Sequence, residues 1–382
     1  MISKRAQKIF PFMVMEILER AQDMERKNED IIHLEIGEPD LDTPDCIKAA
    51  AKRALEDGKT HYTHSLGILE LRKAIAEHYK SRYGVDVSSE KIIVTAGTSP
   101  ALLLVLAALL EPGDEVILPN PHYACYPNFI KFFGGNPIFV PVFEENGFLY
   151  ETPAVKRSIT KSTKAILINS PANPTGAVLS SYGLKALVNL GIYVISDEIY
   201  HGLVYGEREH TILEFTDRVF ILNGFSKLYA MTGFRVGYII APAKFVRPIQ
   251  KMQQNFFICP NSISQYAAIA ALKETQEEVR HIREIYNERR LFMLKHLKAL
   301  GFSIKVEPKG AFYIFVNAKE ISQNSYNLAL DILERAKVAV TPGIDFGSNG
   351  EGYLRFSYAN SLENIAEGMK RLKHYLQCKN VK

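Results

Sequence analysis

The 382-residue sequence contains no tryptophan, only four cysteines, and no long apolar stretch or dense block of one charge. The cysteines (Cys46, Cys125, Cys259 and Cys378) are far apart and form no CxxC pair, which argues against a disulfide framework or zinc site and indicates reduced thiols. The longest apolar run, residues 101–110, is too short to span a bilayer. The 46 basic and 42 acidic residues are dispersed and leave a net charge of +4, so neither a nucleic-acid nor a membrane surface is predicted.

The N-terminal segment superficially resembles a signal peptide, because basic residues precede the apolar residues 9–15. However, Pro11 and Glu16 interrupt this run, and no small-residue cleavage site follows. We therefore expect a cytoplasmic protein. A chain with 47% apolar and 23% charged residues has the balance of a globular protein, and its length favours two domains.

Short apolar runs alternate with helical or loop segments from residue 91 onward. Seven of these runs have the composition of strands: residues 91–95, 115–119, 137–142, 164–169, 192–196, 219–223 and 236–240. Runs such as Ala165-Ile166-Leu167-Ile168 do not alternate with polar residues, as expected for strands buried on both faces. The pattern predicts an α/β fold with a doubly wound, mostly parallel seven-stranded sheet.

Helical patterns surround this predicted sheet, over residues 13–28, 44–57, 67–82 and 283–299. The last of them leads into alternating strands and helices, which we interpret as a smaller α+β domain. The predicted organisation is an N-terminal segment (residues 1–40) that packs with the small domain, a large ligand-binding domain (41–283) and a small C-terminal domain (284–382).

The first polar strand end follows residues 91–95 and consists of Gly97-Thr98-Ser99-Pro100. Thr98 or Ser99 is expected to be the N-cap of a helix that has Pro100 as its first residue. The free N–H groups at the start of such a helix can bind an anion. A plain strand-to-helix turn without a ligand is the alternative.

Two further strand ends carry polar side chains. The loop after residues 164–169 contains two prolines and a glycine and can hold Asn173 as a pre-oriented hydrogen-bonding group, although an ordinary turn is the alternative. Asp197 follows residues 192–196, where a buried carboxylate needs a cation such as a protonated pyridine nitrogen. Tyr200 would then lie near the same ligand. The alternative is an aspartate that caps the following helix.

The strand at 219–223 ends in Gly224-Phe225-Ser226-Lys227, and Arg235 follows eight positions after the lysine. A lysine in apolar surroundings loses part of its charge and becomes a nucleophile, whereas an arginine offers a fork for a phosphate. Pyridoxal 5'-phosphate, a carbonyl cofactor with a phosphate group, would use both. A solvated surface lysine is the alternative, but complementary groups at four strand ends of one sheet favour a cofactor site.

These residues belong to an ordered set of motifs that resembles the class I/II aminotransferases, pyridoxal-phosphate enzymes of fold type I that include aspartate aminotransferase. The resemblance extends from about Ile36 to Arg355, nearly the whole chain. The matching stretches are Glu35-Ile36-Gly37-Glu38-Pro39-Asp40, Tyr62 with Gly67, Pro112-Gly113-Asp114-Glu115-Val116, Pro119-Asn120-Pro121-His122-Tyr123, Asn173-Pro174-Thr175-Gly176, Asp197-Glu198-Ile199-Tyr200, Ser226-Lys227 through Gly237-Tyr238, Gly310-Ala311-Phe312-Tyr313 and Arg355.

The resemblance implies a role for each site residue. Lys227 would form an aldimine with pyridoxal 5'-phosphate and move the substrate proton, and Asp197 would bind the pyridine nitrogen. Asn173 and Tyr200 would contact the phenolic oxygen, and Tyr123 would stack on the ring. The phosphate would be bound by Thr98, Ser99 and Arg235. Gly97 and Ser226 belong to the same cofactor-binding set, and Tyr62 would reach across from a partner subunit. Arg355 would clamp the substrate carboxylate, helped by Gly37 and Asn173, while Tyr123 also borders the substrate.

The implied activity is transfer of the α-amino group of an amino acid to a 2-oxo acid by a ping-pong mechanism, in a homodimer with shared active sites and without a metal. A pyridoxal-phosphate-dependent carbon–sulfur β-lyase is the alternative, because it uses the same lysine, aspartate and arginine. A non-enzymatic regulator is disfavoured, because family-like sequence begins near Ile31 and leaves no room for a DNA-binding region. No GxGxxG follows the first strand, which argues against a nicotinamide dehydrogenase. Thr98 stands where many aspartate-specific relatives have a lysine, and the substrate stays open.

Overall fold

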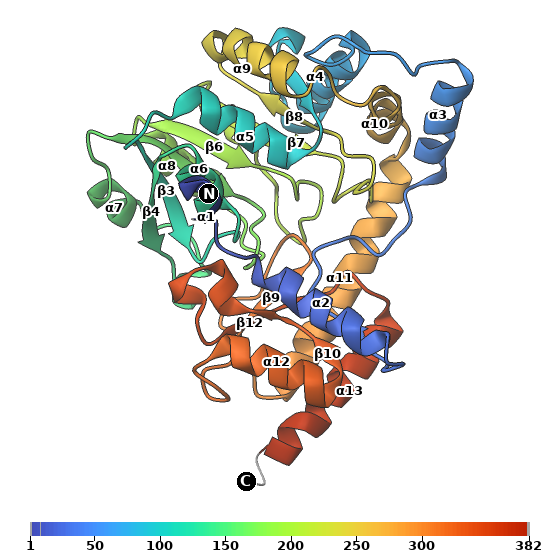
Figure 1. Ribbon diagram of the computed structural model, residues 1–382, viewed down its shortest axis with the longest axis vertical. Helices are drawn as coiled ribbons and strands as arrows, with labels where there is room; N and C mark the ends of the chain where they lie inside the picture. Colours follow the sequence, from blue (N-terminus) through green and yellow to red (C-terminus); the bar gives the residue numbers. More distant parts are fainter. Residues whose placement is uncertain (1, 8, 380–382) are drawn as a thin grey trace.

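The computed structural model describes residues 2–7 and 9–379 (Figure 1). Its largest sheet has seven strands in the order β2-β8-β7-β6-β5-β3-β4. The strands are β2 (Ile92–Thr95), β3 (Glu115–Asn120), β4 (Asn136–Pro141), β5 (Thr163–Asn169), β6 (Tyr193–Asp197), β7 (Val219–Gly224) and β8 (Gly237–Ile240). Each predicted strand is present within one residue at either end. Only β8 runs antiparallel to its neighbours, so the predicted mostly parallel α/β sheet is confirmed.

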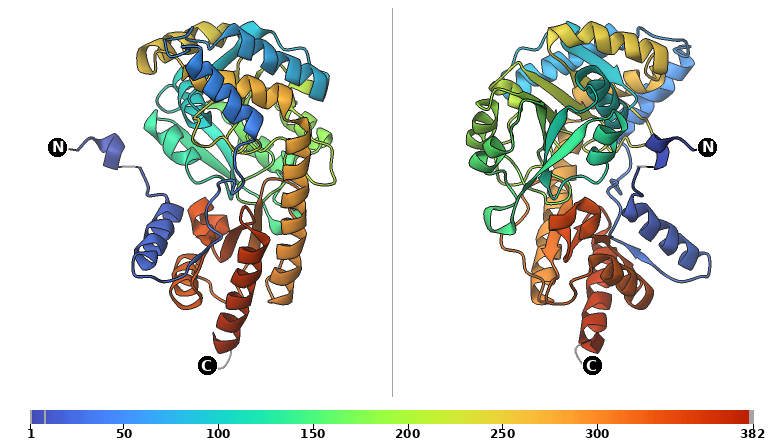
Figure 2. Two further views of the ribbon diagram at one scale, coloured as in Figure 1. Left: turned by 90° about the vertical axis from the view of Figure 1, so that its right-hand side faces the viewer. Right: turned by 60° about the vertical axis from the view of Figure 1, so that its left-hand side comes forward.

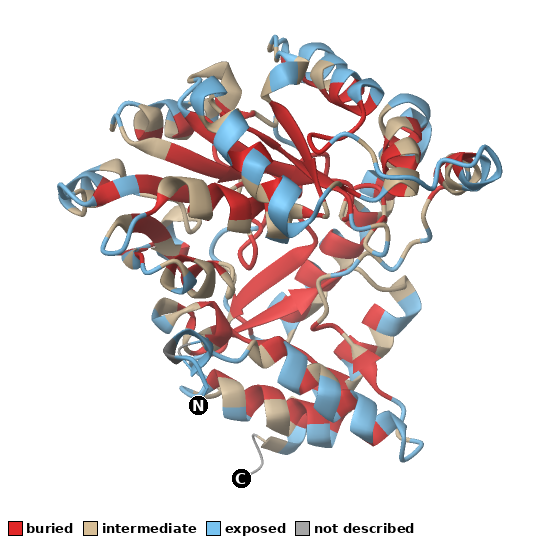
Figure 3. Cartoon of the chain, turned by 45° about the horizontal axis from the view of Figure 1, so that its top comes forward, coloured by how far each residue is buried: buried red, intermediate tan, exposed pale blue. Residues whose placement is uncertain are grey.

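Except at the edge strand β4, both faces of this sheet are largely buried, which explains why its strands do not alternate with polar residues. Neighbouring residues such as Ile166 and Leu167 have no exposed surface and belong to two different apolar clusters. Helices α5 (Thr98–Leu109), α6 (Tyr126–Phe132) and α9 (Ala243–Phe256) contribute to one cluster. Helices α4 (Leu69–Tyr83), α8 (Ser181–Val188) and α10 (Ser262–Glu274) contribute to the other. In Figure 3 most of the strand residues are red, and the surrounding helices carry pale blue, exposed residues.

A second, smaller sheet forms in the C-terminal part of the chain. It has the strand order β11-β12-β9, with β9 (Tyr313–Asn317), β11 (Thr341–Pro342) and β12 (Tyr353–Ser357). Helix α12 (Ser325–Ala336) packs against this sheet, and α13 (Leu362–Lys379) contacts α12 (Figure 1). Together these elements form the α+β arrangement that the alternating C-terminal pattern indicates.

The N-terminal segment lies against this C-terminal part. Strand β1 (Ile32–His33) pairs in parallel with β10 (Val338–Ala339), and α2 (Met13–Glu25) contacts β10, β11 and α12. Figure 2 shows helix α2, in blue, beside the red and orange C-terminal elements. The start of the segment also reaches α6, since the backbone N–H of Phe10 donates to Oδ1 of Asn128 at 3.2 Å, and the packing of residues 1–40 with a small domain stays a prediction.

The long helix α11 (Gln276–Ala299) runs from the upper to the lower part of the molecule (Figures 1 and 2). It begins seven residues before the predicted start, with Glu277 and Glu278 in its first turn, where negative charge is favourable. The predicted domain boundary at residues 283/284 falls inside this helix, and the division of the chain into domains stays a prediction. The other helices are α1 (Lys4–Gln7), α3 (Asp45–Glu56) and α7 (Thr152–Arg157). Among the described residues, none of the helices combines the length and apolar character needed to cross a bilayer.

Candidate active site

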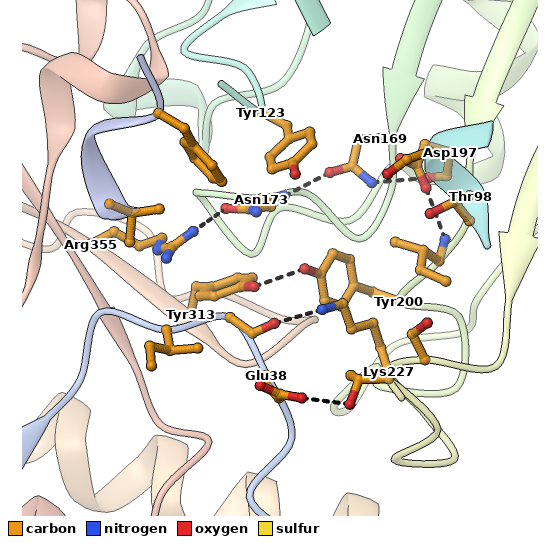
Figure 4. Close-up of a pocket in the computed structure, with 18 of the residues that line it drawn as sticks. Glu38, Thr98, Tyr123, Asn169, Asn173, Asp197, Tyr200, Lys227, Tyr313 and Arg355 are labelled. Carbon is orange, nitrogen blue, oxygen red and sulfur yellow. Dashed lines mark hydrogen bonds between the residues drawn. The ribbon is translucent and has the colours of Figure 1, made fainter. Parts of the chain in front are cut away.

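A pocket of about 360 Å³ lies at the carboxyl ends of the parallel strands, where ligands bind in doubly wound sheets. The ends of β5 and β6, the start of α5, the segment between β7 and β8, the N-terminal segment and the small sheet all line it (Figure 4). Most of the residues expected from the sequence line it: Gly37, Thr98, Ser99, Tyr123, Asn173, Asp197, Tyr200, Ser226, Lys227, Arg235 and Arg355.

The start of α5 and Arg235 form one end of this pocket. Helix α5 begins at Thr98 with Gly97 as its N-cap, so the prediction of Thr98 or Ser99 as N-cap and Pro100 as first helical residue is wrong. Gly97 has a φ of 98°, which glycine adopts without strain and which starts the helix early. A Cβ atom on Gly97 would lie 2.7 Å from Nη2 of Arg235. The absent side chain therefore lets an exposed guanidinium lie beside the free N–H groups of the helix start, as an anion site requires.

Asp197 lies buried at the end of β6, with a relative exposure of 8%. Its Oδ2 accepts a hydrogen bond from the hydroxyl of Tyr126 at 2.7 Å, and its Oδ1 accepts one from the backbone N–H of Ile199 at 3.1 Å. Burial raises the pKa of Asp197, and the bond from Tyr126 opposes that rise. No basic side chain among the described residues forms an ion pair with it. The carboxylate can therefore receive a cationic ring nitrogen.

Lys227 follows β7 and points toward the N-terminal segment. Its Nζ donates a hydrogen bond to the carbonyl oxygen of Gly37 at 2.6 Å. Burial lowers the pKa of Lys227 to about 8, while the nearby charge of Glu38 acts in the opposite direction. Glu38 itself accepts a hydrogen bond from the hydroxyl of Thr232. With a pKa of about 8, roughly a tenth of the Lys227 amine is neutral at pH 7, far more than for an ordinary lysine, and the neutral amine is the form that acts as a nucleophile or general base.

Arg355 lies on β12 of the small sheet and is almost completely buried, with a relative exposure of 2%. Its Nη1 donates to Oδ1 of Asn173 at 2.8 Å, and its Nη2 donates to the backbone carbonyl of Glu35 and to the hydroxyl of Thr341. Its Nε has no hydrogen-bond partner among the described residues, which also offer it no carboxylate within ion-pair distance. A buried guanidinium without an anion is costly, so this site fits a carboxylate ligand.

Two aromatic side chains hold the wall between these groups. The hydroxyls of Tyr200 and Tyr313 are 2.8 Å apart, and the guanidinium of Arg355 lies 4.3 Å from the centre of the Tyr313 ring (Figure 4). Tyr123 lies on another side of the pocket and packs edge-on against Phe12. The backbone N–H of Asn173 donates to Oδ1 of Asn169 at 2.8 Å, which fixes the loop after β5.

The sequence did not identify every residue that the pocket uses. Tyr126 and Asn169 were missed because nothing in their local sequence marks them, and Tyr313 was recognised only as part of a motif without a role. The pocket is also bordered by an apolar group from the N-terminal segment: Phe12, Val14, Met15, Leu18 and Ile36. Tyr62, expected to act across a subunit interface, lies outside the pocket and is 81% exposed.

The residues present fit pyridoxal 5'-phosphate. The phosphate would lie at the α5 start with Arg235, and the pyridine nitrogen would meet the unpaired carboxylate of Asp197. Lys227 and Tyr200 line the same pocket, where Lys227 could contact the carbonyl carbon of the cofactor and Tyr200 its phenolic oxygen. The Nε of Arg355 without a partner leaves a donor for a substrate carboxylate.

Comparison with known proteins supports the same conclusion. The family described as "Aminotransferase class I and II" matches residues 29–372. The chain is 43% identical to the (5-formylfuran-3-yl)methyl phosphate transaminase of Methanocaldococcus jannaschii, over 98% of this chain and 100% of that protein. It is 41% identical to an aspartate aminotransferase of Pyrococcus horikoshii, over 98% and 97% of the two chains. The solved structure of aspartate aminotransferase from Thermus thermophilus with maleate superposes with a TM-score of 0.94 at 37% identity, over 98% and 99% of the chains.

Proposed function

The chain belongs to the class I and II aminotransferase family and is a pyridoxal-phosphate-dependent transaminase, and we propose the following roles for its residues. The observation that carries them is a single pocket that joins a partly buried lysine of lowered pKa with a buried carboxylate and a buried guanidinium, neither of which has an ion-pair partner among the described residues. When bound, pyridoxal 5'-phosphate carries the amino group and withdraws electrons from the substrate α-carbon.

The cofactor is held at both of its ends. Arg235 and the N–H groups of Thr98 and Ser99 bind the phosphate, with the hydroxyl of Ser226 on the same pocket wall. Gly97 contributes by having no side chain that would displace Arg235. Asp197 keeps the pyridine nitrogen protonated, because an ionised carboxylate in a buried site stabilises a neighbouring cation. Asn173 and Tyr200 contact the phenolic oxygen, and Tyr123 packs on the ring.

Lys227 is the proton carrier at the α-carbon. Its lowered pKa leaves a neutral amine available near pH 7, so it can accept a proton and return it at a neighbouring carbon. The carbonyl of Gly37 orients Nζ through the 2.6 Å hydrogen bond. A Cβ atom on residue 37 would collide with the hydroxyl of Tyr313, so the close packing of this backbone against Tyr313 requires glycine.

Arg355 binds the α-carboxylate of the amino acid or 2-oxo acid. The guanidinium is pre-oriented by Asn173 and Thr341 and supported by the ring of Tyr313. Pre-orientation in a buried site lets the bidentate contact form without further ordering of the side chain. Gly37 and Asn173 complete this part of the site.

The proposal includes a homodimer with shared active sites. Tyr62 is 81% exposed and outside the pocket of its own chain, as expected for a residue that acts in a partner's site. A group of exposed apolar side chains at the end of α9 (Phe256, Phe257 and Ile258) offers a surface for association. The four cysteines are unpaired, which agrees with a location in the cytoplasm.

The test is a panel of amino acids mixed with purified enzyme, each followed by the absorbance of the cofactor. A transaminase converts the cofactor stoichiometrically and stably to its amino form and releases a 2-oxo acid, and a second 2-oxo acid reverses the change. Release of pyruvate and ammonia from cysteine-type substrates without this half-reaction would instead establish the β-lyase alternative. Absence of both reactions with every amino acid would refute the proposal.

A further inference from the structure

Helix α2 forms one wall of the pocket although it lacks a cap of its own. Phe12 is its N-cap residue, and no side chain from the adjacent sequence accepts a hydrogen bond from the first turn. The free N–H groups of a helix start need acceptors, and removing them destabilises the turn. The wall therefore depends on a group supplied from elsewhere in the chain.

That group is the carboxylate of Asp345, more than 330 residues away. Its Oδ1 accepts a hydrogen bond from the backbone N–H of Met13 at 3.0 Å, and its Oδ2 accepts one from the N–H of Val14 at 3.2 Å. Both oxygens are thus used on one helix start, where negative charge is also favourable. Asp345 has a relative exposure of 9%, so little water competes for these bonds.

Asp345 is itself held rigidly in a short 3-10 helix, η4 (Gly343–Phe346). The N–H of Ile344 donates to the hydroxyl of Ser325 at 3.1 Å, and the carbonyl of Phe346 accepts the N–H of His122 at 2.9 Å. The ring of Phe346, the residue next to Asp345, lies 5.0 Å from the guanidinium of Arg355. One turn therefore supports both the carboxylate clamp and helix α2.

The first turns of α2 present only apolar side chains to the pocket. We call Phe12, Val14, Met15 and Leu18 the α2 wall. Its ribbon, blue in Figure 4, passes on the Arg355 side of the pocket, and Phe12 packs against Tyr123. The three basic residues that line the pocket each have another role in the proposed function: Lys227, Arg235 and Arg355. An apolar substrate side chain is what the α2 wall can bury.

We propose that Asp345 is a positioning residue that holds the α2 wall in place and thereby determines how well the enzyme accepts amino acids with large apolar side chains. The inference rests on the proposed function, because it assumes that Arg355 holds the α-carboxylate and directs the side chain toward the α2 wall. Asp345 touches neither substrate nor cofactor in this arrangement, and it acts through the two N–H groups of α2.

The experiment compares wild type with Asp345→Ala and Asp345→Asn, measuring kcat/KM of the amino-acid half-reaction for phenylalanine, leucine, alanine and aspartate. The free energy lost with a helix cap corresponds to a change of about 2- to 30-fold in an equilibrium constant. We therefore expect Asp345→Ala to lower kcat/KM for phenylalanine and leucine by about this factor relative to alanine, mainly through KM. Asp345→Asn keeps one acceptor oxygen, so its kcat/KM for phenylalanine and leucine should lie between the values of wild type and Asp345→Ala.

Two controls separate this role from a general structural one. Glu19→Ala changes an exposed residue of α2 outside the pocket and should leave the ratio between substrates unchanged. Met15→Ala, which shortens the α2 wall itself, should lower the phenylalanine-to-alanine ratio as Asp345→Ala does. Hydrogen–deuterium exchange of the peptide 9–20 gives a readout that needs no turnover, and we expect it to be faster in Asp345→Ala than in wild type.

Each result decides. Faster exchange at residues 9–20 together with a selective loss for large apolar substrates supports the proposal. Unchanged exchange, or an equal loss for all amino acids, overturns it. Preference of the wild type for aspartate over every apolar amino acid also overturns it, but leaves the proposed transaminase roles intact. Failure of all amino acids would refute those roles instead, while the exchange experiment would still test the contact between Asp345 and α2.

Discussion

Replacement of Tyr126 by phenylalanine tests how the pocket holds the charge of Asp197. The hydroxyl of Tyr126 is the only side-chain donor among the described residues that bonds this carboxylate, at 2.7 Å. The substitution removes one oxygen atom and preserves the ring, so packing should change little. Because the hydroxyl bond stabilises the ionised form, its loss should raise the pKa of Asp197 further.

The magnitude follows from the kind of bond that is lost. A hydrogen bond to a charged group contributes about 1.5–3 kcal/mol, and this one favours the ionised form that pairs with the pyridine nitrogen. We therefore expect the dissociation constant of the cofactor to rise about 10- to 150-fold. The difference from wild type should narrow at low pH, where Asp197 is protonated in both proteins.

The assay is calorimetric titration of cofactor-free protein with pyridoxamine 5'-phosphate, which binds without a bond to Lys227. Tyr150→Phe is the matched control, because it also removes a tyrosine hydroxyl, one that donates to the backbone carbonyl of Leu167 at 3.1 Å and not to Asp197. Equal affinity in Tyr126→Phe and wild type would refute the reasoning. An equal loss in Tyr150→Phe would show that packing, not the charge of Asp197, is responsible.

Three further predictions concern other parts of the site and its surroundings. Lys227→Ala should retain non-covalently bound cofactor yet lose about 10²- to 10⁴-fold in kcat, and normal turnover in the half-reaction assay would exclude Lys227 as the base. Gly97→Ala should weaken phosphate binding, because the added Cβ would collide with Arg235. Gly113 has a similar φ of 94° but no atom near its Cβ position, so Gly113→Ala should lower only the stability. Titration of both variants with inorganic phosphate distinguishes the two effects. Protonated His33 should stabilise the fold below pH 6.5, and this stabilisation should disappear as the pH rises through about 9, the raised pKa of His33 in the folded state. Urea unfolding of wild type and His33→Gln should therefore show a larger difference in the free energy of unfolding at pH 6 than at pH 10.

Much of this architecture could be predicted from local sequence patterns. Each of the seven strands of the large sheet was expected within one residue, and most were recognisable because strands buried on both faces are continuously apolar. The polar residues that follow these strands, such as Asp197 and Lys227, could be expected at one edge because parallel strands bring their carboxyl ends together. The cofactor type then followed from the chemistry of those side chains.

Contacts between distant parts of the chain could not be predicted in this way. The position of Arg235 beside Gly97 depends on β8 running antiparallel between β2 and β7, which brings its start to the carboxyl edge. The bond between Tyr126 and Asp197 joins a helix and a strand that are 71 residues apart. The N-cap of α5 was misplaced by at least one residue because the φ of a single glycine decided it.

The sequence by itself determined which residue types stand at the strand ends, since burial and turn formation act on neighbours along the chain. Only the tertiary structure decided which of them are charged groups without an ion-pair partner. Among the residues that the structure describes, Asp197 has no basic ion-pair partner, and Arg355 has no acidic one and an Nε without a hydrogen-bond partner. Asp345 reaches the first turn of α2 across more than 330 residues. Such pairings depend on how sheets and helices stack in space, and no local pattern in the chain encodes the distance between them.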